Sequence, residues 1–208
     1  LEHQSHGAER TMKPQLGDTI LNRYTLVSSL REEPGIQAWK ANDRVLAKDC
    51  QLFIITDRSA FAAIDKLAGR IAATRPDRVI PILKYRMESD VLLIVMPVDS
   101  GQCLTDYMVD TAKPLSYSAI RSIIGECADV LREVIADTPS GIVITTDTVR
   151  VTTSGVQIAD APCATMLADT SATDLRTDGP ERYAIRQLAA LLYTLLTRTP
   201  SQATPTFN

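Results

Sequence analysis

Residues 141–162 read GIVITTDTVRVTTSGVQIADAP, and this stretch is more informative about the fold than any other part of the chain. Two runs of alternating, mostly β-branched residues, 149–153 and 155–159, meet at Ser154 and Gly155. A period of two on both sides of a glycine that can adopt a positive φ is typical of a β-hairpin. The stretch therefore predicts two short antiparallel strands, which lead directly into an acidic residue, Asp160.

The composition is that of an ordinary soluble globular chain. Its 208 residues are 45% hydrophobic and 23% charged, which is enough for one domain with a buried core. The net charge of −3 gives no reason to expect nucleic acid or an anionic membrane as a partner, because both favour a clustered positive surface. No run of 18 apolar residues occurs, so we expect a cytoplasmic chain, or the soluble part of a membrane protein.

The cysteines and histidines exclude several classes of site. The four cysteines are spread singly without CxxC spacing, which predicts reduced, mostly buried thiols and no zinc site. Both histidines, His3 and His6, lie in a polar lead-in of the kind seen in tags and linkers. The part expected to fold contains no histidine, so Ser-His-Asp, Cys-His and histidine–metal chemistry are not expected.

The first half of the chain predicts a sheet with one helix. Five runs have the composition of strands and are expected to form a five-stranded antiparallel sheet: residues 24–30, 36–41, 50–55, 79–85 and 91–95. Residues 59–74 change to a helical period, with Phe61, Ile64, Leu67 or Ala68, and Ile71 on one face. Asp57 or Ser59 is the expected N-cap.

The second half predicts helices around the hairpin. Residues 104–109 and 118–137 are expected to be helical, the latter with apolar residues spaced three and four apart over about four turns. Residues 163–178 are polar and rich in threonine, so we expect an exposed loop. Residues 183–200, YAIRQLAALLYTLLTRTP, form the last expected helix.

The order of these elements resembles that of a protein kinase. Residues 141–162 resemble the catalytic segment, residues 92–104 (LLIVMPVDSGQCL) resemble the hinge with Met96 as gatekeeper, and residues 183–200 resemble helix αF. The resemblance implies an α+β, two-lobed fold. It places a polar lead-in at 1–18, the N-lobe and hinge at 19–99, a reduced C-lobe that ends after the αF-like helix at 100–200, and a polar tail at 201–208.

Within this resemblance, nearly every residue that phosphoryl transfer needs is replaced. The three glycines of the phosphate loop, the phosphate-binding lysine, the His-Arg-Asp motif, the metal-binding asparagine and the αF aspartate fall on Arg31, Glu33, Ile36, Phe53, Ile144, Thr145, Thr146, Val149 and Ala184. Asp160, which leads Asp160-Ala161-Pro162 in place of the DFG motif, keeps its type. The resemblance thus implies a pseudokinase with no catalytic residue, metal or cofactor, and a catalytic segment that has lost its αF anchor.

Two other functions remain open from the residues. A nucleotide-binding switch could use Asp160 with a displaced lysine, Lys48 or Lys40, and an atypical active Ser/Thr kinase could use relocated groups. Carboxylates at Glu32 and Glu33 would repel a triphosphate, which disfavours both. Phosphoryl transfer depends on a lysine, a metal and a catalytic carboxylate, of which two are missing, so the active kinase ranks last.

Residues 23–43 (RYTLVSSLREEPGIQAWKAND) and 148–166 (TVRVTTSGVQIADAPCATM) are most similar to the pseudokinase domains attached to the lipid II flippases MviN (MurJ) of actinobacteria. This resemblance implies a regulatory domain at the cytoplasmic face of the membrane that helps to control peptidoglycan synthesis. Its implied partners are a Ser/Thr kinase and an FHA-domain reader of phosphothreonine. The candidate phosphoacceptors, all in the polar stretch 163–178, are Thr165, Thr170, Thr173 and Thr177.

Overall fold

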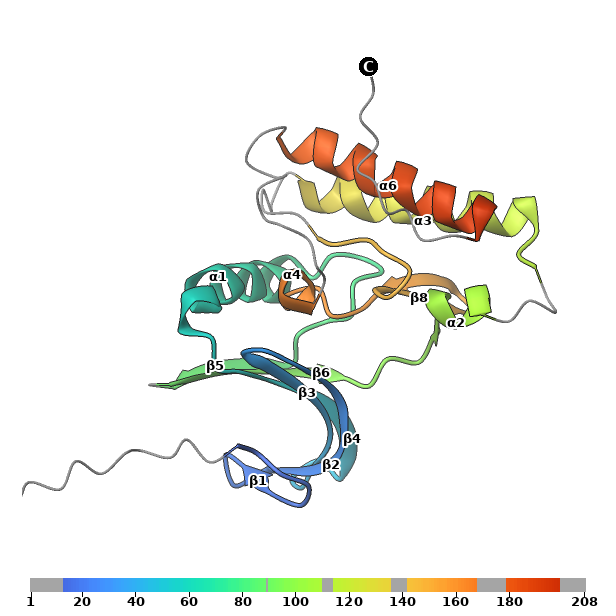
Figure 1. The fold of residues 1–208 in the computed structure, drawn as a ribbon. Coiled ribbons are helices and arrows are strands. Elements are labelled where there is room, and N and C mark those ends of the chain that lie inside the picture. Colours follow the sequence, from blue (N-terminus) through green and yellow to red (C-terminus); the bar gives the residue numbers. More distant parts are fainter. Residues whose placement is uncertain (1–12, 89, 110–113, 136–141, 168–178, 199–208) are drawn as a thin grey trace, which may run out of the picture.

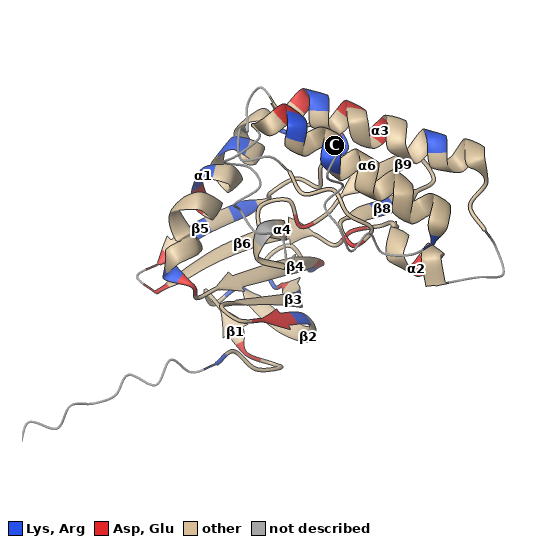
Figure 2. Ribbon diagram, turned by 45° about the horizontal axis from the view of Figure 1, so that its top comes forward, with Lys and Arg blue, Asp and Glu red and all other residues tan. Residues whose placement is uncertain are grey.

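The computed structural model describes residues 13–88, 90–109, 114–135, 142–167 and 179–198. Figure 1 shows a strongly curved antiparallel sheet at one end and two long helices, α3 and α6, side by side at the other. Helix α1 and a small second sheet lie between them. The α+β class expected from the sequence is confirmed. Charged residues of both signs occur in both halves of the described chain (Figure 2).

The curved sheet has six strands rather than the expected five. In spatial order they are β1 (Thr19–Ile20), β2 (Tyr24–Glu33), β3 (Ile36–Asp43), β4 (Lys48–Ile55), β6 (Val91–Pro97) and β5 (Lys84–Glu88), and all neighbours are antiparallel. The additional strand, β1, turns back onto β2 through Leu21 and Asn22, whose φ angles are 52° and 53°. Two residues are too few to show a period, so β1 left no pattern in the sequence.

The strand expected at residues 79–85 is displaced toward the C-terminus. Val79 forms a single parallel bridge with Ile158, and regular pairing begins only at Lys84. Pro81 lies between these points, and proline has no N–H to donate to a ladder. Residues 79–83 therefore cross from α1 to β5 as irregular chain.

The spacing of the strands at residues 24–30 and 36–41 predicts a hairpin between them, which is confirmed, but the turn is tighter than the expected residues 31–35. Arg31 pairs with Ala38 and Glu33 with Ile36, which leaves only Pro34 and Gly35 at the turn. Gly35 has a φ of 79°, and a Cβ there would lie 2.6 Å from the Cβ of Asp57. Only glycine satisfies both requirements. The residues at the expected phosphate-loop positions are thus held in paired strands.

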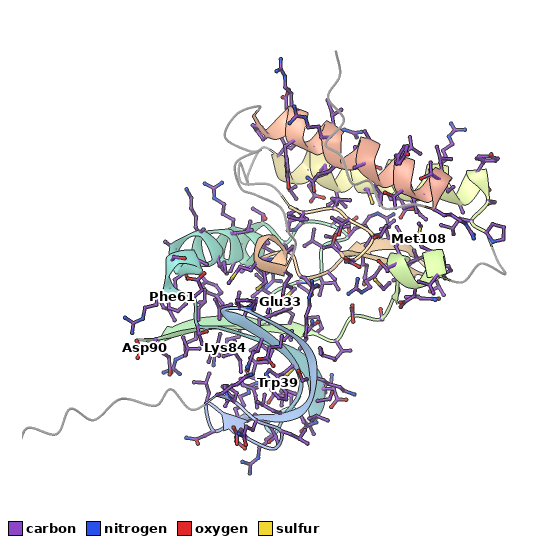
Figure 3. The ribbon with its side chains drawn as sticks, in the orientation of Figure 1. Glu33, Trp39, Phe61, Lys84, Asp90 and Met108 are labelled. Atoms are coloured by element: carbon purple, nitrogen blue, oxygen red, sulfur yellow. The ribbon has the colours of Figure 1, made fainter. Side chains whose placement is uncertain are left out.

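Both faces of the curved sheet carry a hydrophobic core in its middle strands, whereas the edge strand β5 is exposed. Helix α1 (Arg58–Thr74) packs on one face with the apolar side chains expected from its period, and Asp57 caps it by accepting a hydrogen bond from the backbone N–H of Ser59 at 2.9 Å. The opposite face closes on itself inside the curl, around Trp39 and Leu52. Figure 3 shows Trp39 within the curl and Phe61 on α1. The sheet therefore acts as a rigid platform for the residues on β4.

The second half consists of three helices longer than one turn, a short helix and a three-stranded sheet among the described residues. Their bounds are β7 (Gln102–Cys103), α2 (Leu104–Val109), α3 (Tyr117–Ile135), β8 (Val149–Thr152), β9 (Gly155–Ile158), α4 (Ala164–Leu167) and α6 (Pro180–Thr197). The hairpin β8–β9 is confirmed, and β7 pairs with β8. Helices α3 and α6 share a core with α2 and the hairpin.

Two further expectations can be compared with this part of the fold. Residues 163–178 are not loop throughout, because Cys163 and Ala164 are buried and α4 begins at Ala164. The cysteines are unpaired, and three of the four are buried, as expected. No helix in the described ranges is both long and apolar enough to cross a membrane.

Candidate functional site

The candidate site surrounds Asp160, where β4 and the β2–β3 hairpin face the segment that follows β9. Asp160 has a φ of 58°, and its Oδ1 atom lies 3.5 Å from the Nε2 donor of Gln51 on β4. Burial raises the pKa of the Asp160 carboxyl above its usual value, and the Arg150 guanidinium opposes this increase. Asp99 and Arg31 are the next two charged neighbours. Asp160 is therefore already engaged by side chains of the chain itself.

Arg150 connects the hairpin to the crossover between the two halves. Its Nε donates to the carboxylate of Asp99, and its Nη1 donates to the carbonyl of Asp147 and approaches the Sγ of Cys103 at 3.5 Å. The side chains of Arg150 and Asp99 are 14% and 24% exposed. A largely desolvated, hydrogen-bonded ion pair of this kind holds its two elements in one arrangement.

Arg31 joins the first hairpin to the second half of the chain. Its Nη2 donates to the carbonyl of Leu167, the last residue of α4, at 2.5 Å, and its Nε lies 3.4 Å from a carboxylate oxygen of Glu33. Figure 3 shows Glu33 at the end of the hairpin, on the side that faces α4. The position where a phosphate loop would need a glycine is thus occupied by a side chain that holds the hairpin against α4.

The position expected for a phosphate-binding lysine contains a buried aromatic ring. Phe53 has no exposed surface and packs in a core that contains residues of α1 together with Ala159 and Cys163. A phenylalanine at this position predicts an apolar side chain buried between the two halves, and its burial is confirmed. Neither alternative lysine is among the described partners of Asp160, since Lys40 pairs with Asp49 at 2.9 Å and Lys48 is exposed at the start of β4.

Residues 142–144, which lead into the position expected for His-Arg-Asp, are held by hydrogen bonds to helix α6. The backbone N–H of Ile144 donates to Oε1 of Gln187 at 2.6 Å, and Nε2 of Gln187 donates to the carbonyl of Ile142 at 3.1 Å. Gln187 is buried on α6, one turn beyond Ala184. The expectation that the segment lost its anchor with the αF aspartate was therefore wrong. A side-chain amide satisfies one donor and one acceptor, a pairing that a lone carboxylate cannot make.

The hydroxyl groups near this segment are also used for structure. Oγ1 of Thr148 accepts from the N–H of Thr145 at 2.9 Å and donates to the carbonyl of Val143 at 2.9 Å. The carbonyl of Thr146 accepts from the N–H of Thr105, and Val149 is fully buried at the start of β8. Within the described ranges, no three His, Cys, Asp or Glu side chains are placed to hold a metal ion.

A cavity of about 400 Å³ lies away from Asp160, between α2, the segment 144–146 and α6. Met108 (labelled in Figure 3), Thr146 and Leu191 line it, and Arg198 borders it. None of the described residues that line it carries a carboxylate, and the lining includes residues 144–146 but not Asp160. The cavity therefore offers no substitute for the nucleotide site that the resemblance would place near Asp160.

No protein-family model matches the chain, and no curated protein matches it. The function therefore rests on the geometry around Asp160. That geometry can hold the two halves together through three long-range polar contacts, and no lysine is among the described groups that act on Asp160.

We expect the chain not to bind ATP in the presence of Mg²⁺ or Mn²⁺. A ligand at 100 times its dissociation constant stabilises a protein by about 2.7 kcal/mol, which for a chain of this size would raise the melting temperature by about 5 °C or more. Thermal shift at millimolar nucleotide should show no such change, whereas an active Ser/Thr kinase domain measured in parallel should shift. Saturable binding at micromolar ATP in calorimetry would favour the nucleotide switch instead.

Proposed function

We propose that this chain is a catalytically inactive, kinase-like domain that regulates other proteins by binding them. The observation that carries this proposal is the occupation of the expected nucleotide site by the chain's own side chains. Phe53 fills the lysine position, Gln51 contacts Asp160, and Arg31 closes the hairpin onto α4. The side chains that fill this site hold the two halves of the domain together.

The arrangement of the elements supports the kinase-like part of the proposal. A curled antiparallel sheet with one helix on its face is followed by an irregular crossover at residues 98–101, then by α2, α3, a hairpin and α6. This is the order that the sequence resemblance implied. The six-stranded sheet, the late start of β5, helix α4 and the hydrogen bonds made by Gln187 are features that the resemblance did not imply.

The specific role that we propose is control of peptidoglycan synthesis through a lipid II flippase, at the cytoplasmic face of the membrane. The support for this role is the similarity of residues 23–43 and 148–166 to the flippase-attached pseudokinases. In such a role a Ser/Thr kinase modifies the domain and an FHA-domain reader binds it. Thr165 lies in α4, while Thr170, Thr173 and Thr177 lie outside the described residues.

Phosphorylation should therefore occur in the threonine-rich stretch 163–178 and should create a binding site for an FHA-domain protein. Each phosphate adds a charge of about −1.5 to −2, which an FHA domain binds through arginine and hydrogen-bond donors. The domain is incubated with an active transmembrane Ser/Thr kinase from the same cell, and sites are mapped by mass spectrometry. Reader binding, measured by calorimetry, should rise from undetectable to micromolar affinity.

Alanine variants identify the segment responsible. Changing Thr165, Thr170, Thr173 and Thr177 together should abolish reader binding, whereas changing Thr204 and Thr206 in the tail should leave it intact. If the two sets have the opposite effects, the tail is the regulated segment and residues 163–178 are a connector.

A further inference from the structure

Helix α6 has two apolar faces, whose centres are separated by roughly 110° around the helix, and only one of them is covered within the described chain. Ala184, Leu191 and Leu195 face the core that contains α3. On the other side, four large apolar side chains are exposed by 63%, 37%, 54% and 50%: Ile185, Leu192, Tyr193 and Leu196. A contiguous set of large, exposed apolar side chains is typical of an interaction site. The outer face is therefore expected to have a partner.

The exposed residues form a continuous strip, which we call the outer stripe. At 100° per residue, Ile185, Ala189, Leu192 and Leu196 fall within roughly 60° of the helix circumference. Along one edge of this stripe follow Arg182, Arg186 and Tyr193. No charged residue occurs from Gln187 to Thr197, and the ribbon is tan over this length in Figure 2.

We propose that the outer stripe binds the same stripe on a second copy of the chain, with the two α6 helices antiparallel and the two-fold axis at Ala189. The pattern is self-complementary about that residue. In an antiparallel pair Ile185 faces Leu192 of the second copy, and Arg182 lies along Leu196 of the second copy. Arg186 faces the ring of Tyr193 of the second copy, which favours a cation–π contact. For each of these pairs, the mean of the two residue numbers lies within about half a residue of 189, as a two-fold axis at Ala189 requires.

Shape and charge favour a second copy over other partners. Ala189 is the smallest residue of the stripe and lies at its middle, where two crossing helices approach most closely. In an antiparallel pair, the edge of the outer stripe that carries Arg182, Arg186 and Tyr193 faces the same edge of the second copy. Because the two helices run in opposite directions, each arginine then meets an aromatic ring or an aliphatic chain rather than another arginine. One helix pair covers less than the roughly 1,600 Å² of a standard interface, so we expect a dissociation constant on the order of 100 µM.

Sedimentation equilibrium from about 10 µM to about 1 mM should show a monomer–dimer equilibrium. Leu192→Asp and Leu196→Asp should each weaken dimerisation at least about tenfold. Leu46→Asp is the matched control, because Leu46 is similarly exposed, 58%, but lies in the β3–β4 turn. Circular dichroism checks that each variant stays folded. A chain that remains monomeric at about 1 mM, or a dimer that both α6 variants leave intact, would overturn the proposal.

Cysteine cross-linking tests the axis independently of affinity. Ala189→Cys should form a disulfide-linked dimer under mild oxidation, because the two thiols meet at the axis. Ile185→Cys alone should not, but a mixture of Ile185→Cys and Leu192→Cys chains should yield the mixed dimer. The native chain, whose cysteines are mostly buried, measures the background. If Ile185→Cys chains cross-link to each other while Ala189→Cys chains do not, the helices pair in another geometry, and the proposed antiparallel pairing is overturned.

Discussion

Replacing Phe53 by alanine is expected to lower the free energy of unfolding by about 3–5 kcal/mol. Phe53 is completely buried, and it lies opposite Ala38 on β3 and Ile94 on β6 in the centre of the sheet. Its ring also belongs to the core that joins the sheet to α1 and to Cys163. Truncation therefore removes apolar contacts on three sides and leaves a cavity that a rigid, paired strand cannot close by relaxing.

Urea unfolding followed by circular dichroism measures this loss, with the change taken from the midpoint at unchanged slope. Leu30→Ala is the control, because Leu30 lies on β2 of the same sheet but is 53% exposed, and it should change stability by less than about 0.5 kcal/mol. Phe53→Leu should fall between the two. Equal midpoints for Phe53→Ala and the native chain would mean that this side chain is not part of the core, and the argument for a filled nucleotide site would fail with it.

Replacing Gln187 by alanine is expected to cost about 2–4 kcal/mol. The buried amide donates to the carbonyl of Ile142 and accepts from the N–H of Ile144. Both backbone groups are buried, so each would lose its partner without gaining water. The segment 142–144 should become the weak point of the second half, because nothing else on α6 is described as bonding to these two groups.

Two variants separate the hydrogen bonds from packing. Gln187→Met keeps the length of the side chain and removes both hydrogen bonds, whereas Gln187→Glu keeps an acceptor for Ile144 and removes the donor to Ile142. Met should be nearly as destabilising as Ala if the bonds dominate. Amide hydrogen exchange at Ile144 should become faster in the Ala and Met variants, which remove its acceptor, and should change least in Gln187→Glu, which keeps it. A Met variant as stable as the native chain would show that Gln187 contributes by filling space and not by anchoring the segment.

Local patterns in the sequence were sufficient for much of the fold. The β8–β9 hairpin, the buried face of α1, the Asp57 cap and the extent of α2 follow from period, turn residues and capping, which involve neighbours within a few positions. The same applies to the burial of Phe53, since an uninterrupted apolar run in a strand predicts a core on both faces. The positions assigned to the candidate site, including Ile144 and Asp160, rest on the order of the elements and remain a prediction.

The elements that were missed or displaced had weak local signals or were decided by remote partners. Strand β1 is too short to show a period, and β5 begins at Lys84 because Pro81 interrupts the ladder before it. The first hairpin extends to Glu33 because the strands pair on either side of Gly35, where the nearby Asp57 leaves no room for a side chain. None of these outcomes can be seen in a window of a few residues.

The sequence by itself determined which residue types occupy the candidate site: no lysine, phosphate-loop glycine or His-Arg-Asp motif stands at the positions where the resemblance would place them. Only the tertiary structure decided what the replacements do. Arg31 meets Leu167 across 136 residues, Gln51 meets Asp160 across 109, and Gln187 reaches Ile144 across 43. The physical reason is that a polar side chain has several possible partners of equal chemistry. When distant elements pack together, they bury some backbone groups that still lack a hydrogen-bond partner. The side chain binds the group of this kind that lies within its reach.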